Sequence, residues 1–372
     1  MRFTINHSLL LENLNYVSKA ISTKTPMPIL TGIKLDVRFS GLTMTASNSD
    51  ISIQTIISDP RLKVEEEGVI VVPGKYFLDL VRKAEAEDLE FITFEGNTVK
   101  ILANKSNFTL ISMDYASYPL ISFSNSDTFV TLDTLNLKQL VRKTSFSASL
   151  SETRLILTGV NFTASGNKLE AVATDSYRLS KKFMTFEKDF PTISVVIPSK
   201  SLDELAKIIE DNQGSVEMHV SPTKVLFKYK NILFQTRLIE GKYPDLSLII
   251  PSNFINNVTF NKTDLINAVE RASLFSNVEG NHIILMDINQ STVKISSTNS
   301  EIGAVIEELT PISQTDNRPL QLAFSSKYFL EAAKSFDDNE ITFHFTGEIK
   351  PFIITSQHDY NLIQLILPVR AS

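Results

Sequence analysis

The segment Ala173-Thr174-Asp175-Ser176-Tyr177-Arg178-Leu179 is the one place where a carboxylate stands among hydroxyl, phenol and guanidinium groups. Such a set could support acid–base chemistry centred on Asp175, Tyr177 and Arg178. Asp50, however, lies 125 residues earlier in a similar context. A carboxylate that recurs in this way favours a shared structural turn, so an enzyme centred on Asp175 is the less favoured interpretation.

Other chemistries lack their usual residues. The 5 His include no pair at the i, i+4 spacing of a helical zinc motif, and the 12 Gly form no phosphate-binding motif. With 0 Cys there is no thiolate nucleophile or ligand. The acidic run Glu65-Glu66-Glu67 is typical of a solvated turn. The residues therefore indicate no metal site and no machinery for nucleotide hydrolysis or nucleotide-cofactor chemistry.

Composition indicates a folded protein of several domains. The 372 residues are 42% hydrophobic and include 24 Phe, enough for large cores. The net charge of −6 excludes a protein held on nucleic acid mainly by bulk charge. The first residues contain no apolar signal region, and no stretch reaches the roughly 18 apolar residues of a membrane span. We expect a soluble cytoplasmic protein without a membrane partner.

The chain contains a threefold internal repeat. A short alternating strand precedes a helix N-cap at Asn6, Asp133 and Asn261, and apolar residues recur four and eight positions after each cap, as on one face of a helix. The apolar runs 28–30, 155–157 and 283–285 then predict buried strands. Further strands are predicted at 42–46, 169–173 and 293–297.

A second strand-to-helix step occurs in each third, in register at Lys75, Lys200 and Lys327. The repeat predicts three similar α+β domains, each with two helices on antiparallel sheet, at 1–125, 128–250 and 254–372. The polar, turn-rich segments 122–128 and 251–257 are the expected linkers.

Together with this repeat, three motifs resemble the bacterial sliding clamp family, the DNA polymerase III beta subunit. They are the segment 173–179, Glu240-Gly241-Lys242-Tyr243-Pro244-Asp245 and Leu367-Pro368-Val369-Arg370. The resemblance covers the whole chain. It implies a processivity factor that is not an enzyme and has no catalytic residue, metal or cofactor. In this family two subunits close head to tail into a ring around duplex DNA, with helices inside and sheets outside, and tether the replicative polymerase. Three domains in each of two subunits give a pseudo-sixfold ring.

The resemblance also implies which residues meet DNA. A ring retained by topology needs only weak, mobile contacts with phosphates, which agrees with the negative net charge. The expected DNA-facing residues are Lys24, Lys75, Arg82, Arg142, Lys143, Lys200, Lys207 and Lys327.

A second implied site is a pocket for short linear motifs that carry a glutamine and large apolar side chains. The partners would be the replicative polymerase, the clamp loader and repair proteins. Its expected residues are Arg154, Leu157, Thr174, Ser176, Tyr177, Arg178, Leu179, Pro244, Leu248, Ile249, Leu365, Leu367, Pro368, Val369 and Arg370.

The implied homodimer seam joins the first domain's edge strand to the third domain of the next subunit, through Phe108, Leu110, Leu274, Phe275 and Glu301. Glu301 and Glu307 would pair there with cations such as Lys105 or Lys75. The alternative to the clamp is a three-domain scaffold that binds peptides and does not bind DNA.

Overall fold

Each α-helix in the described residues starts directly after a strand, as the repeat predicts. The computed structural model describes residues 1–22, 25–94, 97–211, 214–276 and 282–369. Asn6 accepts a hydrogen bond from the backbone N–H of Leu9 at 3.3 Å, and Asn261 from that of Asp264 at 3.1 Å, so both are N-caps. The α-helices are α1 (His7–Val17), α2 (Gly74–Lys83), α3 (Thr134–Arg142), α4 (Ser199–Ile208), α5 (Lys262–Ser276) and α6 (Ser326–Lys334).

The chain divides into two compact units, and every strand pairing in the described residues is antiparallel. The first unit comprises Met1–Leu137 and Glu204–Leu238, and the second comprises Lys138–Asp203 and Ile239–Ser372. Each unit contains two sheets. The predicted class, α+β with helices on antiparallel sheet, is therefore confirmed at the level of each unit.

The first unit holds a five-stranded and an eight-stranded sheet. The five-stranded sheet has the order β5-β1-β7-β8-β9, with β1 (Arg2–Asn6), β5 (Leu62–Glu66), β7 (Asp88–Phe94), β8 (Thr98–Ala103) and β9 (Ser106–Ile111). The eight-stranded sheet has the order β10-β15-β16-β17-β4-β3-β2-β6, with β2 (Gly32–Arg38), β3 (Gly41–Ser47), β4 (Ile51–Ile57), β6 (Gly68–Pro73), β10 (Phe129–Asp133), β15 (Ser215–Val220), β16 (Lys224–Tyr229) and β17 (Ile232–Arg237).

The second unit holds a nine-stranded and a four-stranded sheet. The nine-stranded order is β14-β11-β12-β13-β26-β25-β24-β18-β22, with β11 (Gly159–Ser165), β12 (Lys168–Thr174), β13 (Arg178–Thr185), β14 (Ile193–Pro198), β18 (Asn256–Asn261), β22 (Ser313–Gln314), β24 (Glu340–Phe345), β25 (Phe352–Thr355) and β26 (Leu362–Ile366). The four-stranded order is β21-β20-β19-β23, with β19 (Ile283–Ile288), β20 (Val293–Asn299), β21 (Gly303–Leu309) and β23 (Leu320–Ser325).

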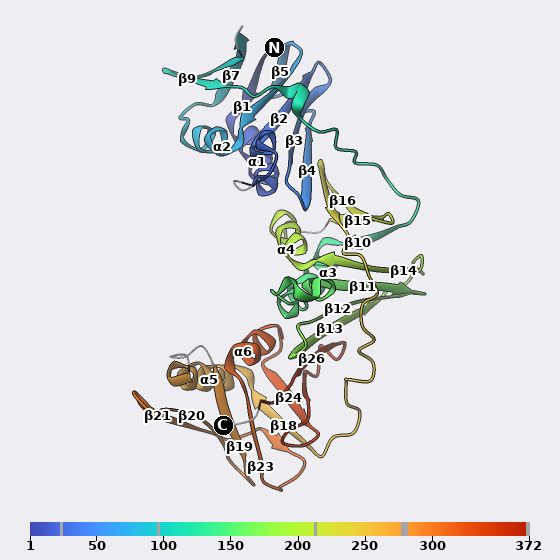
Figure 1. The fold of residues 1–372 in the computed structure, drawn as a ribbon, viewed down its shortest axis with the longest axis vertical. Helices are drawn as coiled ribbons and strands as arrows, with labels where there is room; N and C mark the ends of the chain where they lie inside the picture. Colours follow the sequence, from blue (N-terminus) through green and yellow to red (C-terminus); the bar gives the residue numbers. More distant parts are fainter. Residues whose placement is uncertain (23–24, 95–96, 212–213, 277–281, 370–372) are drawn as a thin grey trace. The chain divides into compact units, whose positions relative to one another are not determined.

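Pairs of helices cover the apolar faces of these sheets. In the first unit α1 packs on α2 and on β3 and β4, and in the second α5 packs on α6 and on β20 and β21 (Figure 1). The apolar positions predicted from the repeat are buried: Leu10, Leu14, Leu137, Val141, Leu265 and Val269. Burying each such side chain favours folding by about 1.5–3 kcal/mol.

Two of the predicted strands are 3-10 helices. The run 28–30 lies in η2 (Pro28–Thr31) and 155–157 in η5 (Glu152–Thr158), whereas 283–285 does form β19. In both 3-10 helices the last Thr hydroxyl closes the turn on a carbonyl three residues earlier, at 2.8 and 2.7 Å. Gly32 and Gly159 follow, where a Cβ would approach Val71 and Val196 within 2.5 and 2.6 Å. The other short helices are η1 (Ser18–Ala20), η3 (Tyr115–Ser117) and η4 (Ser145–Ser147).

A buried charge cluster joins α3's C-terminal end to the β26 region in the second unit. The Lys143 side chain is 2% exposed and that of Lys182 is 4% exposed, and both ammonium groups contact Asp359. Lys143 also reaches Asp337 at 2.8 Å, which lowers the pKa of that carboxyl. Burial lowers the pKa of Lys182, against the opposing effect of Asp359. Each buried cation of the cluster therefore has a carboxylate partner, as a charge removed from water requires.

The lowered pKa of Asp337 gives a stability prediction. A carboxyl whose pKa is lower in the folded state adds stability above its unfolded pKa and loses it as pH falls through the folded value. We expect Asp337→Asn to lower the free energy of unfolding by about 1 kcal/mol at pH 7, with the difference from wild type shrinking as the pH falls through the lowered pKa of Asp337. Urea unfolding at a series of pH values measures both. Asp50→Asn, which replaces an exposed carboxylate without an ion pair among the described residues, is the control, and an equal effect of the two variants would contradict the prediction.

Candidate functional site

The Asp175 carboxylate is held by a backbone turn. Its Oδ1 accepts hydrogen bonds from the N–H groups of Tyr177 and Arg178 at 2.9 and 3.0 Å. The side-chain oxygen of Asn48 likewise accepts hydrogen bonds from the backbone N–H groups two and three residues later, and so does that of Asn299. The interpretation as a shared structural turn is thus confirmed, with one correction: the counterpart of Asp175 in the first repeat is Asn48 and not Asp50.

This turn directs its two largest side chains to opposite environments. Ser176 has a φ of 80°, a left-handed conformation that sharpens the bend after Asp175. Tyr177 then points outward with 61% of its surface exposed, whereas Arg178 is 7% exposed. A short turn at the end of β12 therefore supplies both a surface ring and a buried cation.

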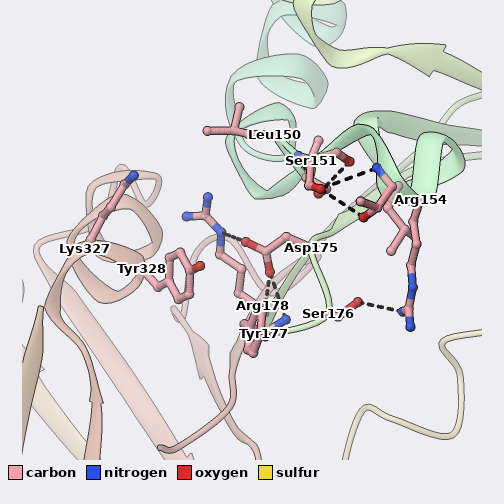
Figure 2. Close-up of a pocket in the computed structure, with 13 residues that line it drawn as sticks. Leu150, Ser151, Arg154, Asp175, Ser176, Tyr177, Arg178, Lys327 and Tyr328 are labelled. Carbon is pink, nitrogen blue, oxygen red and sulfur yellow. Dashed lines mark hydrogen bonds and ion pairs between the residues drawn. The ribbon is translucent and has the colours of Figure 1, made fainter. Parts of the chain in front are cut away.

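Arg178 is bonded on every side of its guanidinium group. Nε donates to Asp175 at 3.0 Å, and the terminal nitrogens donate to Glu331 of α6 and to the backbone carbonyl of Phe146. The guanidinium also lies over the Tyr328 ring, 4.5 Å from its centroid. Figure 2 shows the side chain between the Asp175 turn and Tyr328. Arg178 thus links the segment after β12 to helix α6.

A cavity of about 470 Å³ opens beside this arginine; we call it the Arg178 cavity. Arg154 and Lys327 bring positive charge from opposite sides, and several hydroxyl groups face it (Figure 2). Asp175 is the only carboxylate among the described lining residues, and it already forms an ion pair with Arg178. The lining residues are Ala148, Ser149, Leu150, Ser151, Thr153, Arg154, Leu157, Asp175, Ser176, Tyr177, Arg178, Lys327 and Tyr328.

An apolar cluster lies beneath the cavity. Leu157 belongs to both, and it packs with the buried Leu179, Leu365 and Tyr243. The Tyr243 hydroxyl accepts a hydrogen bond from the Thr174 N–H at 3.1 Å, and burial raises the pKa of this phenol. The floor is therefore a fixed part of the hydrophobic core.

The structure brings together part of the predicted pocket. Arg154, Leu157, Ser176, Tyr177 and Arg178 line the cavity. Thr174, Leu179 and Leu365 are buried, and Leu367 packs on the same cluster. The remaining predicted residues do not line this cavity: Pro244, Leu248 and Ile249 are exposed, Pro368 and Val369 are half-buried, and Arg370 lies outside the described residues.

Sequence reasoning missed the side of the cavity formed by residues 148–153 and by α6. Leu150 stands alone among small polar residues, a pattern that points to an exposed apolar contact. Tyr328 directly follows the register residue Lys327, which we expected to face DNA and which is also one of the residues that line the cavity. The repeat predicts that Lys327 stands near the start of a helix. It does not predict that this helix lies beside the turn at Asp175, because the two segments are far apart in the sequence.

The seven predicted DNA-facing residues that the structure describes fall into three groups. Lys75, Arg82, Lys200 and Lys327 are exposed. Arg142 and Lys207 are also exposed but have carboxylate partners, Asp337 and Glu204. Lys143 is buried against Asp337 and Asp359, so its prediction is wrong: the ammonium group is unavailable to DNA. Lys24 lies outside the described residues.

The residues predicted for the dimer seam lie on or near two sheet edges. Phe108 and Leu110 are on β9, an edge of the five-stranded sheet. Leu274 and Phe275 end α5, and Glu301 precedes β21, an edge of the four-stranded sheet. Glu307 pairs within the chain with Arg271 at 2.6 Å.

No group of three His, Asp or Glu side chains among the described residues is arranged to hold a metal ion. Likewise, none of the described helices is both long and apolar enough to cross a membrane.

The structure thus consists of repeated α+β modules that share sheets, and residues of two modules line the Arg178 cavity. The N-terminal, central and C-terminal domains of the DNA polymerase III beta subunit match residues 1–122, 131–245 and 247–370. The beta sliding clamp of Staphylococcus epidermidis is 36% identical over 375 residues, covering 100% of this chain and 99% of that protein.

Solved structures agree. The DNA polymerase sliding clamp of Bacillus subtilis and the DNA polymerase III beta chain of Streptococcus pneumoniae each align with a TM-score of 0.96 and 36% identity, over 100% of both chains. The chain therefore belongs to the DNA polymerase III beta subunit family. The predicted resemblance, the α+β fold of three clamp-type domains and the role as a DNA polymerase processivity factor are confirmed.

The buried contacts of Arg178 predict a large stability effect. Arg178→Ala leaves Asp175 without its ion pair inside the fold, and we expect the free energy of unfolding to fall by about 3 kcal/mol. Arg154→Ala is the matched control, because Arg154 makes one 3.3 Å hydrogen bond to Ser176 at the surface and should change stability by less than about 0.5 kcal/mol. Denaturant unfolding compares them, and similar losses would contradict the role given to Arg178.

Proposed function

We propose that two copies of this chain close head to tail into a ring around duplex DNA, and that the Arg178 cavity holds short linear segments of replication and repair proteins. The observation that carries the proposal is the cavity itself. It combines an apolar floor, an exposed aromatic ring and two cations whose described contacts include no carboxylate. Such a site can desolvate large apolar side chains while a few polar groups fix their orientation.

The composition of the cavity favours a particular peptide. Leu157, Leu150 and Tyr177 offer apolar surface, and the surrounding hydroxyl groups can hydrogen-bond a glutamine amide. Arg154 and Lys327 favour an acidic residue beside the apolar anchors. Segments of this kind in the replicative polymerase, the clamp loader and repair proteins are the proposed partners, and the role requires neither a catalytic group nor a cofactor.

Two sheet edges support ring closure. β9 exposes Ile111 at 74% and β21 exposes Ile306 at 66%, and the described residues show no strand beyond either edge. Unpaired backbone groups with apolar side chains are a template for another strand. We place Phe108, Leu110, Leu274, Phe275 and Glu301 at this seam, with the apolar contacts dominant because exposed ion pairs contribute only about 0–1 kcal/mol each.

The contact with DNA is proposed to be weak. Of the cations expected to face DNA, Lys75, Lys200, Arg82 and Lys327 are exposed and form no ion pair among the described residues, whereas Arg142 and Lys207 are partly neutralised. Few free cations suit a ring that slides. The domains of such a ring are proposed at 1–125, 128–250 and 254–372, and its place of work is the cytoplasm.

Retention on DNA tests the ring. The protein, loaded by its cognate loader on nicked circular DNA, should remain bound in 0.5 M salt and leave when the circle is cut to a linear form, because topology and not charge holds it. Gel filtration of the two DNA forms measures retention. Equal loss from circular and linear DNA would overturn the ring, and the scaffold that binds peptides without DNA would then be the better explanation.

Binding of a fluorescent peptide with one glutamine, one acidic and two large apolar residues tests the cavity. We expect Tyr177→Ala to weaken binding by about tenfold, since a buried aromatic contact is worth about 1–2 kcal/mol. Tyr360→Ala, also an exposed tyrosine but outside the cavity, should leave affinity unchanged. Unaltered affinity in Tyr177→Ala would refute the assignment of the cavity while leaving the ring intact.

A further inference from the structure

A buried glutamine lies where the central and the C-terminal repeat share a sheet. Gln364 of β26 pairs with Ser180 of β13, and the two residues are 1% and 0% exposed. At the first junction, between β17 and β4, Phe234 pairs with Ile53 in the same way, and Ile53, like Ser180, stands five residues after the Asx residue of its turn. The second junction therefore needs hydrogen-bond partners that the apolar first junction does not need.

Every hydrogen-bonding group of the Gln364 amide has a partner. Its Nε2 donates to the Lys143 carbonyl at 3.0 Å and to the Ser335 hydroxyl at 2.9 Å, and its Oε1 accepts from the Ser180 hydroxyl. Because Ser180 has only one proton to donate, the Ser147 hydroxyl, 2.5 Å away, is the donor to Ser180. A flipped amide would set its oxygen against the Lys143 carbonyl, so the Gln364 side chain has one orientation.

Helix α6 connects this network to one wall of the Arg178 cavity. The first turn of α6 carries Lys327 and Tyr328, which line the cavity. Its C-cap is Ser335, whose hydroxyl donates to the Ala332 carbonyl at 2.6 Å and accepts from Gln364. A helix of 9 residues moves as one body, so the hydrogen bond at its C-terminal end restricts where its first turn lies.

The opposite wall of the cavity is held by the same network. Ser147 ends η4, and the lining residues 148–151 follow it directly. The Ser147 hydroxyl is bonded to Ser180, and the Phe146 carbonyl beside it accepts from Arg178. Two walls that are far apart in the sequence therefore meet at one pair of buried polar side chains, on β13 and β26.

Resting on the function proposed above, we infer that Gln364, together with Ser180, is a positioning residue that sets the separation of the two walls and thereby the affinity of the cavity for a peptide. Gln364 itself is too buried to touch the peptide. A fully bonded polar network specifies one arrangement, whereas apolar contacts have no direction. The four equivalent positions at the first junction are apolar and buried: Ala20, Ile53, Ile208 and Phe234.

Spin-label distances test the positioning directly, because the chain has 0 Cys and introduced thiols are its only ones. Leu150→Cys and Lys327→Cys place one nitroxide on each wall (Figure 2), and dilution into unlabelled protein restricts the measurement to distances within one chain. We expect one narrow distance distribution when Gln364 is present and a distribution about twice as broad in Gln364→Leu. Phe234→Leu, at the equivalent position of the first junction, is the matched control and should leave the distribution unchanged.

Peptide affinity, measured in protein without labels, tests the consequence. With the fluorescent peptide described above, Gln364→Leu should raise the dissociation constant about tenfold, the result expected if the walls keep their binding arrangement in about one molecule in ten. Phe234→Leu truncates a core side chain and should lower stability without changing the dissociation constant.

A variant that copies the first junction separates positioning from stability. Ser147→Ala, Ser180→Ile and Gln364→Phe together replace polar partners by apolar side chains, so the unfolding midpoint should stay close to that of wild type. This triple variant should nevertheless show the broad distribution and the weak binding of Gln364→Leu. Wild-type distances in either folded variant would overturn the inference, and Gln364→Leu decides it alone if the triple variant does not fold.

The two measurements separate this inference from the proposed function. Distances are measured without peptide, so they decide whether Gln364 positions the walls even if wild type binds no peptide and the function proposed for the cavity fails. If wild type binds and Gln364→Leu binds equally well with unchanged distances, the positioning role is wrong and the proposed function stands. A broader distribution without loss of affinity would overturn the link between wall separation and peptide binding.

Discussion

Backbone hydrogen bonding at the sheet edges is the constraint on which this structure depends. The last strand of a sheet has backbone N–H and C=O groups without partners on one side, and such an edge pairs readily with another strand. Within the chain this need is met twice, by β17 with β4 and by β26 with β13. The connection between repeats is thus a continuous sheet, which resists bending more than a flexible linker does.

Arg178 distinguishes the turn beside the cavity from the corresponding turn of the first repeat. At the equivalent position of the first repeat stands Ile51, which is buried among apolar neighbours and carries no charge. The buried guanidinium of Arg178 instead needs partners for its charge. Asp175 and Glu331 accept its hydrogen bonds, and the aromatic ring of Tyr328 lies against it. These contacts tie the Asp175 turn to α6 beside the cavity that Leu157 also lines.

The sequence pattern predicted what is local and missed what is distant. The caps Asn6 and Asn261, the apolar helix positions and the register lysines follow from spacing within one repeat, and the structure confirms the caps and the burial. The runs 28–30 and 155–157 look like strands because they are apolar, but Thr side chains close them into 3-10 turns. Burial of Lys143 depends on Asp359, more than 200 residues away, which no local pattern reveals.

The shared sheets have a consequence for the middle third of the chain. If residues 128–250 were produced alone, β17 would lose β4 and β13 would lose β26, and the apolar cluster under Leu157 would lose Leu365 and Ile353. Such a fragment presents two long open strands and a bare hydrophobic face, a combination that promotes aggregation. The middle repeat is therefore expected to aggregate when it is produced alone. In the full chain, β4 and β26 of the neighbouring repeats cover its open strand edges.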